Sequence, residues 1–269
     1  MHRLLKAFFF KIKRDLTFKI SLIIGISFAV ITVAELFTIN SGKFINGQGM
    51  LLTSFSPIQS FGFVIPVNLI IFVCLEFSQG SIRNKIIAGN SKLKIYFSLV
   101  LSGLVFMLAL IAAYTLICTA FGCIFGGFDL SKPVLLIGAL SMDPATTSVT
   151  FLLQYSLISL LIYLGVCMMA IFLATSFRNI GPAIPIVVAV IFLGFLGTAY
   201  LVLANRNNEA LMTVSRIFDP FYGCFAPQVE GQAFVLSNVD FISSVACNLG
   251  WAILFFVLGC IEFTKRDVK

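Results

Sequence analysis

Long apolar runs, separated by short polar segments, make up most of the chain. A helix of roughly 20 apolar residues crosses a bilayer core of about 30 Å. Six runs reach that length, at about 18–37, 57–77, 95–121, 151–177, 181–203 and 241–263. The pattern predicts an all-α integral membrane protein with six transmembrane helices, in which residues 1–269 form a single transmembrane domain.

The composition supports a membrane protein and argues against a soluble one. Of the 269 residues, 59% are hydrophobic and 11% are charged, whereas a soluble domain is about 45–50% apolar and about 25% charged. A soluble fold of this length could not bury so much apolar surface. The net charge of +7 would otherwise suggest nucleic acid, but the basic residues follow the membrane topology, so no nucleic-acid partner is expected.

The positions of Lys and Arg predict the orientation, because cytoplasmic loops carry the excess of these residues. With a cytoplasmic N-terminus, the outer segments hold four of the 18 basic residues, namely Lys43, Lys132, Arg206 and Arg216. The opposite orientation would invert the rule at every loop. We therefore predict that both termini are cytoplasmic.

Four of the segments outside the predicted spans carry expectations of their own. Residues 1–17 mix apolar side chains with cations, which suits an amphipathic helix in the cytoplasmic interface or a simple positive flank that fixes orientation. Residues 38–56 and 122–150 are rich in Gly, Ser, Thr and Asn and are expected to be outer loops. Residues 204–240 are too polar to span and too apolar for a free loop, so a hairpin dipping back into the outer leaflet is expected.

The sequence offers little for catalysis. The motifs GxxxxGK[ST], HExxH and GxSxG do not occur, His2 is the single histidine, and the seven cysteines form no CxxC pair. No pair of acids lies in the middle of a predicted span, where ionisable groups usually serve a function. An enzyme, a metal site, a cofactor in this chain and an ion-coupled pump are therefore not expected. Cys123 and Cys224 would both face outside, and whether they pair is open.

The exit of the second span has the most distinctive pattern. The span ends at Glu76, Gly80 allows a break, and a short basic amphipathic helix follows, for which Gly89 and Asn90 can form the C-terminal cap. Its apolar residues are Ile82, Ile86 and Ile87, and its polar residues are Arg83, Asn84 and Lys85. From the residues alone, the segment is either a surface for a cytoplasmic protein or an interfacial turn that obeys the positive-inside rule.

This segment resembles a known family. The run Glu76-Phe77-x-x-Gly80-Ser81-Ile82-Arg83-Asn84-Lys85 is similar to the E-F-x-x-G-T-I-[RK]-x-[KL] stretch of type-2 ABC exporter permeases, with Ser81 in place of the usual Thr. Residues 91–96, SKLKIY, match the S-+-x-x-[IF]-Y that follows, and the C-terminal FTKRDV resembles the family's usual ending.

The resemblance implies a machine with several subunits. In this family, the short helix is a coupling helix that docks on a separate ATP-binding subunit, which binds ATP and Mg²⁺, and the N-terminal amphipathic helix contacts the same subunit. Two permease chains, identical or paralogous, pair in the membrane, and a re-entrant outer hairpin precedes the last span. Carried over to this chain, the coupling residues are Glu76, Arg83, Asn84 and Lys85. Glu76 would cap or tether the helix, and the basic residues Arg83 and Lys85 would meet acids on the ATPase.

Small residues mark candidate helix contacts, since they let helix backbones approach in lipid. Ser21, Gly25 and Ala29 lie on one face of the first span, and Gly194 and Gly197 lie close together on the fifth. The resemblance places the first and fifth spans near the dimer interface, and packing within one chain is the alternative.

The leading hypothesis is the permease subunit of an ABC exporter in a bacterial plasma membrane. It would move an amphipathic or hydrophobic substrate outward, such as a peptide, a bacteriocin or a drug, with lipid around it. The alternatives are a stand-alone channel or scaffold without an ATPase, and polysaccharide export by the same fold.

Cysteine labelling checks the orientation. In a variant whose seven cysteines are replaced by serine, Lys132→Cys should react with a membrane-impermeant maleimide in intact cells. Lys94→Cys should react only after the membrane is permeabilised, because it lies on the predicted cytoplasmic side. Labelling of Lys94→Cys in intact cells would contradict the orientation.

Overall fold

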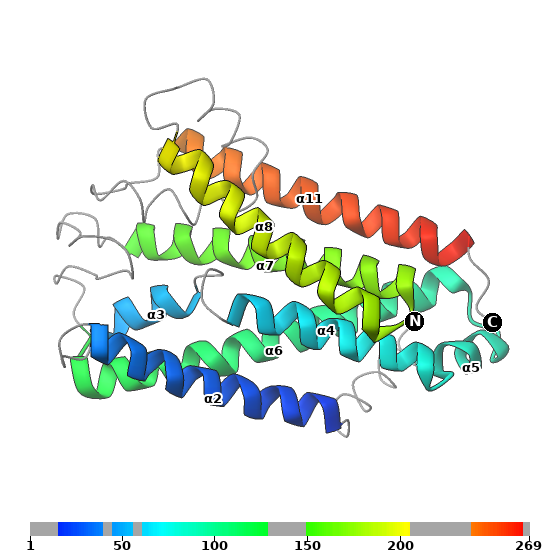
Figure 1. The fold of residues 1–269 in the computed structure, drawn as a ribbon, viewed down its shortest axis with the longest axis horizontal. Coiled ribbons are helices and arrows are strands. Elements are labelled where there is room, and N and C mark those ends of the chain that lie inside the picture. Colours follow the sequence, from blue (N-terminus) through cyan, green and yellow to red (C-terminus); the bar gives the residue numbers. More distant parts are fainter. Residues whose placement is uncertain (1–15, 40–44, 56–60, 129–148, 205–237, 266–269) are drawn as a thin grey trace.

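The computed structural model describes residues 16–39, 45–55, 61–128, 149–204 and 238–265, and every element in these ranges is a helix (Figure 1). In chain order the helices are α2 (Leu16–Ile39), α3 (Gly47–Phe55), α4 (Phe61–Ser78), α5 (Ser81–Ile87), α6 (Lys92–Gly126), α7 (Val149–Phe177), α8 (Ile180–Ala204) and α11 (Asn238–Lys265). The predicted all-α class is confirmed for these ranges.

The membrane-spanning helices match the predicted apolar runs within a few residues. Five helices, α2, α6, α7, α8 and α11, are long and apolar enough to cross a membrane. A sixth crossing results if α4 and α5, which are bent by 52° at a short break, count as one broken span. The structure is therefore compatible with a multi-pass membrane protein of five to six spans.

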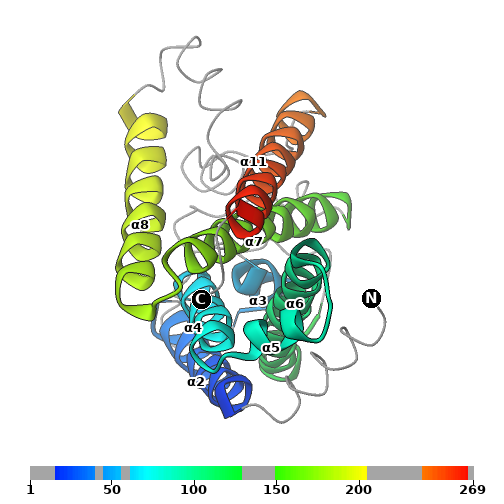
Figure 2. The same cartoon turned by 90° about the vertical axis from the view of Figure 1, so that its right-hand side faces the viewer.

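The spans form an elongated bundle whose long axis is horizontal in Figure 1. The α5 end of the bundle holds α5, the end of α11 and the start of α6, and the opposite end holds α3. In the end-on view of Figure 2, α3 and α4 lie among α2, α6 and α7, while α8 and α11 lie farther out. Burial follows this arrangement. Of the apolar stretch of each helix, 61% is buried in α6 and in α7, but only 17% in α8 and 22% in α11.

The outer faces of the bundle are apolar. Ile23 of α2 is 62% exposed, Leu193 of α8 is 66% exposed and Ile253 of α11 is 61% exposed. A water-soluble protein rarely exposes continuous apolar faces of this extent. In a bilayer, the same faces contact hydrocarbon without a cost.

The segment 38–56 contains a helix, so the expectation of a simple outer loop was wrong. α3 occupies Gly47–Phe55 and is mostly buried against α6. Its backbone joins the end of α6 directly, because the amide of Gly47 donates to the carbonyl of Gly127 at 2.9 Å. The small polar residues that suggested a loop instead allow close packing, and α6 itself extends to Gly126, beyond the expected end at 121.

Hydrogen bonds between side chains join the spans inside the bundle. The hydroxyl of Ser21 lies 3.0 Å from Oδ1 of Asn68 and joins α2 to α4. Thr32 and Tyr114 share a hydrogen bond of 2.8 Å that joins α2 to α6. In hydrocarbon, polar side chains of neighbouring helices satisfy one another because no water is present to do so.

The contact between α3 and α6 predicts a position that tolerates no side chain. A Cβ at Gly122 would lie 2.6 Å from Cγ of Met50 and 2.9 Å from Cα of Gly47. We expect Gly122→Ala to destabilise the protein by about 1–3 kcal/mol, as overpacking does, seen as a lower Tm in detergent. Gly250→Ala on α11 is the matched control, since nothing lies within 4 Å of its Cβ position. An equal Tm for the two variants would show that the contact is not tight.

Candidate functional site

The residues after α4 form a sharp corner that places α5 at the end of the bundle (Figures 1 and 2). Gly80 has a φ of 66°, in the left-handed region that favours glycine. Its carbonyl accepts from the amide of Asn84 at 3.0 Å, which begins α5. The break predicted at Gly80 and the short helix predicted after it are both confirmed.

The C-terminus of α5 has the hydrogen bonds of a Schellman motif. Gly89 has a φ of 83° and donates its amide to the carbonyl of Ile86 at 2.9 Å. The amide of Asn90 donates to the carbonyl of Lys85 at 3.3 Å, and its side-chain nitrogen donates to the same carbonyl at 3.0 Å. These bonds satisfy carbonyls that a helix end leaves open, so the predicted cap is confirmed.

A partly buried ion pair joins α5 to α4. Nζ of Lys85 lies 2.8 Å from Oε2 of Glu76, and the side chains of Lys85 and Glu76 are 16% and 1% exposed. Glu76 lies in the last turn of α4, where the helix dipole disfavours a negative charge, and the cation of Lys85 offsets that effect. A buried charge deprived of its partner costs about 3–5 kcal/mol, so the pair holds α5 in place.

The opposite face of α5 is free of the bundle. Ile82 is fully buried and Ile86 packs against the core. Arg83 and Asn84 are exposed, and Ile87 is 74% exposed. Sequence reasoning grouped Ile87 with the buried isoleucines and missed that it shares the exposed face with Arg83, four residues earlier. That spacing of one helical turn was the available signal. We call Arg83, Asn84 and Ile87 the α5 face.

The neighbouring helix ends meet at the α5 end. Nζ of Lys92, in the first turn of α6, donates to the carbonyl of Thr264 near the end of α11 at 3.2 Å. The ring of Phe77 lies 6.1 Å from the ring of Phe263. The guanidinium of Arg178 lies over the ring of Phe77, 5.6 Å from its centroid. Three spans and the turn between α7 and α8 therefore converge around the base of α5.

An aromatic contact fixes α6 to α11 one turn further along. The hydroxyl of Tyr96 donates to the carbonyl of Phe256 at 3.1 Å. A Cβ at Gly259 would collide with that hydroxyl, so glycine makes the contact possible. The ring of Tyr96 also lies 5.6 Å from that of Phe263.

The basic residues of the described ranges all lie at the α5 end. They occur in the first turns of α2 and α6, in α5, in the turn after α7 and at the end of α11: Lys19, Arg83, Lys85, Lys92, Lys94, Arg178 and Lys265. The charge asymmetry that the topology prediction used is thus gathered at one end of the bundle.

The small residues predicted as contact points have different surroundings. Ser21, Gly25 and Ala29 are buried within the chain, and Sγ of Cys118 donates to the carbonyl of Ala29 at 3.9 Å. Gly194 is half-buried, and Gly197 is exposed with nothing within 4 Å of its Cβ position. In α2 these residues therefore serve packing inside one chain.

Some expectations lie outside the described residues. These are the amphipathic helix at 1–17, of which all but the last two residues are undescribed, the outer hairpin of 204–240, for which only its flanks are described, and Cys224. Cys123 is exposed near the end of α6. Within the described ranges, no group of three or more His, Cys, Asp or Glu side chains could hold a metal ion.

One comparison with known proteins identifies a family. Residues 4–269 match the model of a family described as protein of unknown function (DUF2705). The chain belongs to this family. No curated protein and no solved structure matches the chain. The family description names no activity, so function must be argued from the geometry of the α5 end.

The ion pair predicts non-additive effects on stability. Lys85→Met leaves the buried carboxylate of Glu76 without its cation, and we expect a loss of up to about 3 kcal/mol, because one partner is partly exposed. Lys85→Met combined with Glu76→Met should lose less than Lys85→Met alone. Thermal unfolding in detergent measures both.

Arg83→Met is the matched control for this prediction, since it removes the same charge from the exposed face. A change within about 0.5 kcal/mol is expected there, as for most surface substitutions. If the double variant is less stable than Lys85→Met, the pair does not hold α5 in the way described.

Proposed function

We propose that this chain is the membrane-spanning permease subunit of an ABC exporter of the type-2 kind. The observation that supports this most is the α5 face, a short exposed surface of a cation, an amide and an isoleucine on a helix held by a partly buried ion pair. An exposed apolar side chain beside an exposed cation suits contact with another protein. Under this proposal, that protein is a cytoplasmic ATPase subunit.

The four coupling residues then divide into two roles. Arg83 and Asn84, together with Ile87, contact the ATPase. Glu76 and Lys85 do not contact it but hold α5 against α4 through their 2.8 Å ion pair. Glu76 is therefore a tether of the coupling helix, one of the two roles that the sequence suggested, and Lys85 is its partner.

Movement of the ATPase would be transmitted through the contacts around α5. The ion pair links α5 to α4, and the capped turn at Gly89 and Asn90 links it to α6. The bond between Lys92 and Thr264 carries the same displacement to α11. ATP and Mg²⁺ belong to the partner chain, and the binding energy released there would shift the spans between inward-open and outward-open arrangements.

The orientation, the second permease chain and the substrate in this proposal follow the predicted topology and the resemblance. The α5 end faces the cytoplasm, where positive loops are retained, and both termini lie on that side of a bacterial plasma membrane. A second permease chain completes the pathway, and the outer hairpin and the N-terminal interfacial helix have the places that the resemblance gives them. The apolar lining of the spans suits an amphipathic or hydrophobic substrate that moves outward.

The main competing function is a stand-alone channel or scaffold, in which α5 is an interfacial helix. Ile87 beside Arg83 would also suit a helix that lies among lipid headgroups. The two functions differ in whether a cytoplasmic ATPase binds the α5 face.

Co-purification tests the proposal. Tagged protein from its native cells should retain an ATPase subunit, and Arg83→Glu with Ile87→Ser should reduce the retained amount about tenfold or more, as hot-spot residues do. Lys265→Glu is the control, because it reverses an exposed charge at the same end of the bundle without touching α5. Lys85→Glu is unsuitable as a variant, since it would break the pair with Glu76.

Two results would argue against the exporter. One is wild-type protein that never retains an ATPase under mild detergent. The other is equal retention by the α5 variant and by Lys265→Glu, which would leave the interfacial interpretation of α5.

A further inference from the structure

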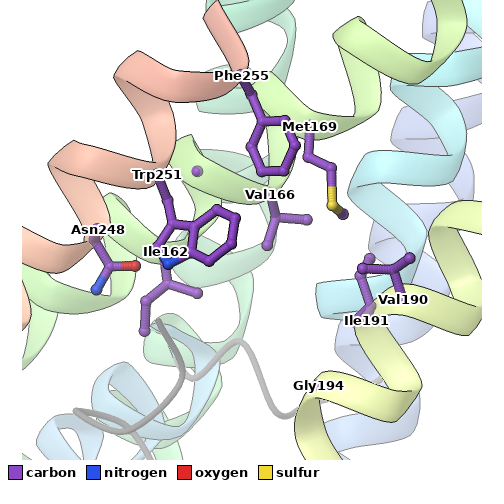
Figure 3. A pocket seen from close by; sticks show the side chains of 10 residues that line it. Ile162, Val166, Met169, Val190, Ile191, Gly194, Asn248, Trp251 and Phe255 are labelled. Atoms are coloured by element: carbon purple, nitrogen blue, oxygen red, sulfur yellow. The ribbon is translucent and has the colours of Figure 1, made fainter. Parts of the chain in front are cut away.

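A cavity of about 230 Å³ lies among α7, α8 and α11, on the side of the bundle away from α2. Figure 3 shows side chains from α7 and α11 on one side of it and those of α8 on the other. The lining residues are Ile162, Gly165, Val166, Met169, Val190, Ile191, Gly194, Asn248, Trp251 and Phe255.

The walls of the cavity offer hydrocarbon contacts almost alone. Asn248 is the one polar side chain in the lining, and its Nδ2 donates to the carbonyl of Ser244 in its own helix at 2.9 Å. The ring of Trp251 stacks on that of Phe255 at 5.5 Å between centroids. A ligand here would be held by dispersion contacts with the walls, with no charged group to recognise a headgroup or an ion.

The cavity is closed at the back and open to the side. Ile162 and Ile191 are 1% exposed, whereas Val190 is 45% exposed and Trp251 is 37% exposed. Val190 is on α8 and Trp251 is on α11, so the mouth lies between these two helices. α8 and α11 are also the two spans with the smallest buried share. The mouth therefore opens toward the medium around the bundle.

The depth of the cavity identifies that medium. The lining residues occupy the middle of all three spans, at 162–169 of Val149–Phe177, 190–194 of Ile180–Ala204 and 248–255 of Asn238–Lys265. The middle of a span lies in the hydrocarbon core, far from headgroups and water. The molecules that reach the mouth there are the acyl chains of phospholipids.

The size of the cavity fits part of one such chain. A cavity of about 150 Å³ lined by aliphatic and aromatic side chains is enough to bind benzene. The cavity here is larger, at about 230 Å³, and its glycines, Gly165 and Gly194, leave the wall without side chains at two points.

We propose that this cavity binds one acyl chain of a membrane phospholipid, which enters between Val190 and Trp251 and fills the space among α7, α8 and α11. The proposal concerns the chain by itself and does not require an ATPase partner. It can therefore fail or succeed independently of the exporter function.

Trp251 reports on the site because it is the only tryptophan in the chain. Purified protein in detergent is titrated with phosphatidylcholine whose acyl chains carry bromine near their middle, which quenches tryptophan fluorescence on contact. We expect quenching that saturates at a low fraction of brominated lipid in the micelle. Quenching by passing lipid alone would rise in proportion to that fraction.

Variants on α8 separate the cavity from the general lipid surface. Gly194→Leu fills the cavity and should raise the midpoint of quenching about tenfold, which corresponds to about 1.4 kcal/mol. Gly197→Leu is the matched control, since it adds the same side chain to an exposed position of the same helix. It should leave the midpoint unchanged.

A second pair of variants covers the case in which Gly194→Leu does not fold. Val190→Phe narrows the mouth, and Leu193→Phe enlarges an exposed side chain outside the lining, so the first alone should weaken the saturable quenching. Proportional quenching in the wild type, or the same midpoint in Gly194→Leu and Gly197→Leu, would overturn the proposal. So would quenching that appears only after a dimer dissociates, because a second copy would then fill the cavity.

Discussion

Polar groups inside a hydrocarbon medium must find partners within the protein, and this constraint organises the bundle. It explains why every described element is a helix, since a helix satisfies its own backbone. It also explains two contacts between buried polar side chains of different helices: Ser21 meets Asn68, and Thr32 meets Tyr114. The strongest case is Glu76, a carboxylate at the end of an apolar span, whose charge is matched by Lys85 of the next helix. The position of α5 follows from that match.

The sequence predicted the spans because hydropathy over about 20 residues is a strong, local signal. It failed at α3, where the signal is weak. Gly47 and Gly122 suggested a loop by composition, yet they allow α3 and α6 to approach closely. This role depends on a contact between two helices and cannot be recognised from either segment alone. The break at Gly80 and the cap at Gly89 were predictable, since a positive φ favours glycine in any context.

The candidate site was predicted in its residues but only partly in their roles. The resemblance to type-2 ABC exporter permeases marked Glu76, Arg83, Asn84 and Lys85 as coupling residues. Whether a cation on a seven-residue helix faces a buried acid or the exterior depends on how α5 is oriented against α4. That orientation comes from the direction of the corner at Gly80 and from the burial of Ile82. Both depend on the packing of α5 against the bundle and not on the local sequence. Lys85 faces Glu76, and Ile87 takes the exposed position one helical turn after Arg83, although its hydrophobicity grouped it with Ile82 and Ile86.

The two proposed sites are linked physically through α4, which contacts α5, α7 and α8. α4 carries the tether of α5 on one end, and it packs against both α7 and α8. The contact with α8 includes the rings of Phe63 and Phe195, whose centroids are 5.6 Å apart. The cavity proposed to bind an acyl chain lies where α8 and α7 meet α11. A close-packed core transmits a shift instead of absorbing it. Under the exporter proposal, a displacement of α5 that moves α4 would therefore alter the spacing of α7 and α8. An acyl chain in the cavity would then resist or favour that displacement according to which spacing accommodates it, because a ligand shifts an equilibrium only through its different affinity for the two states.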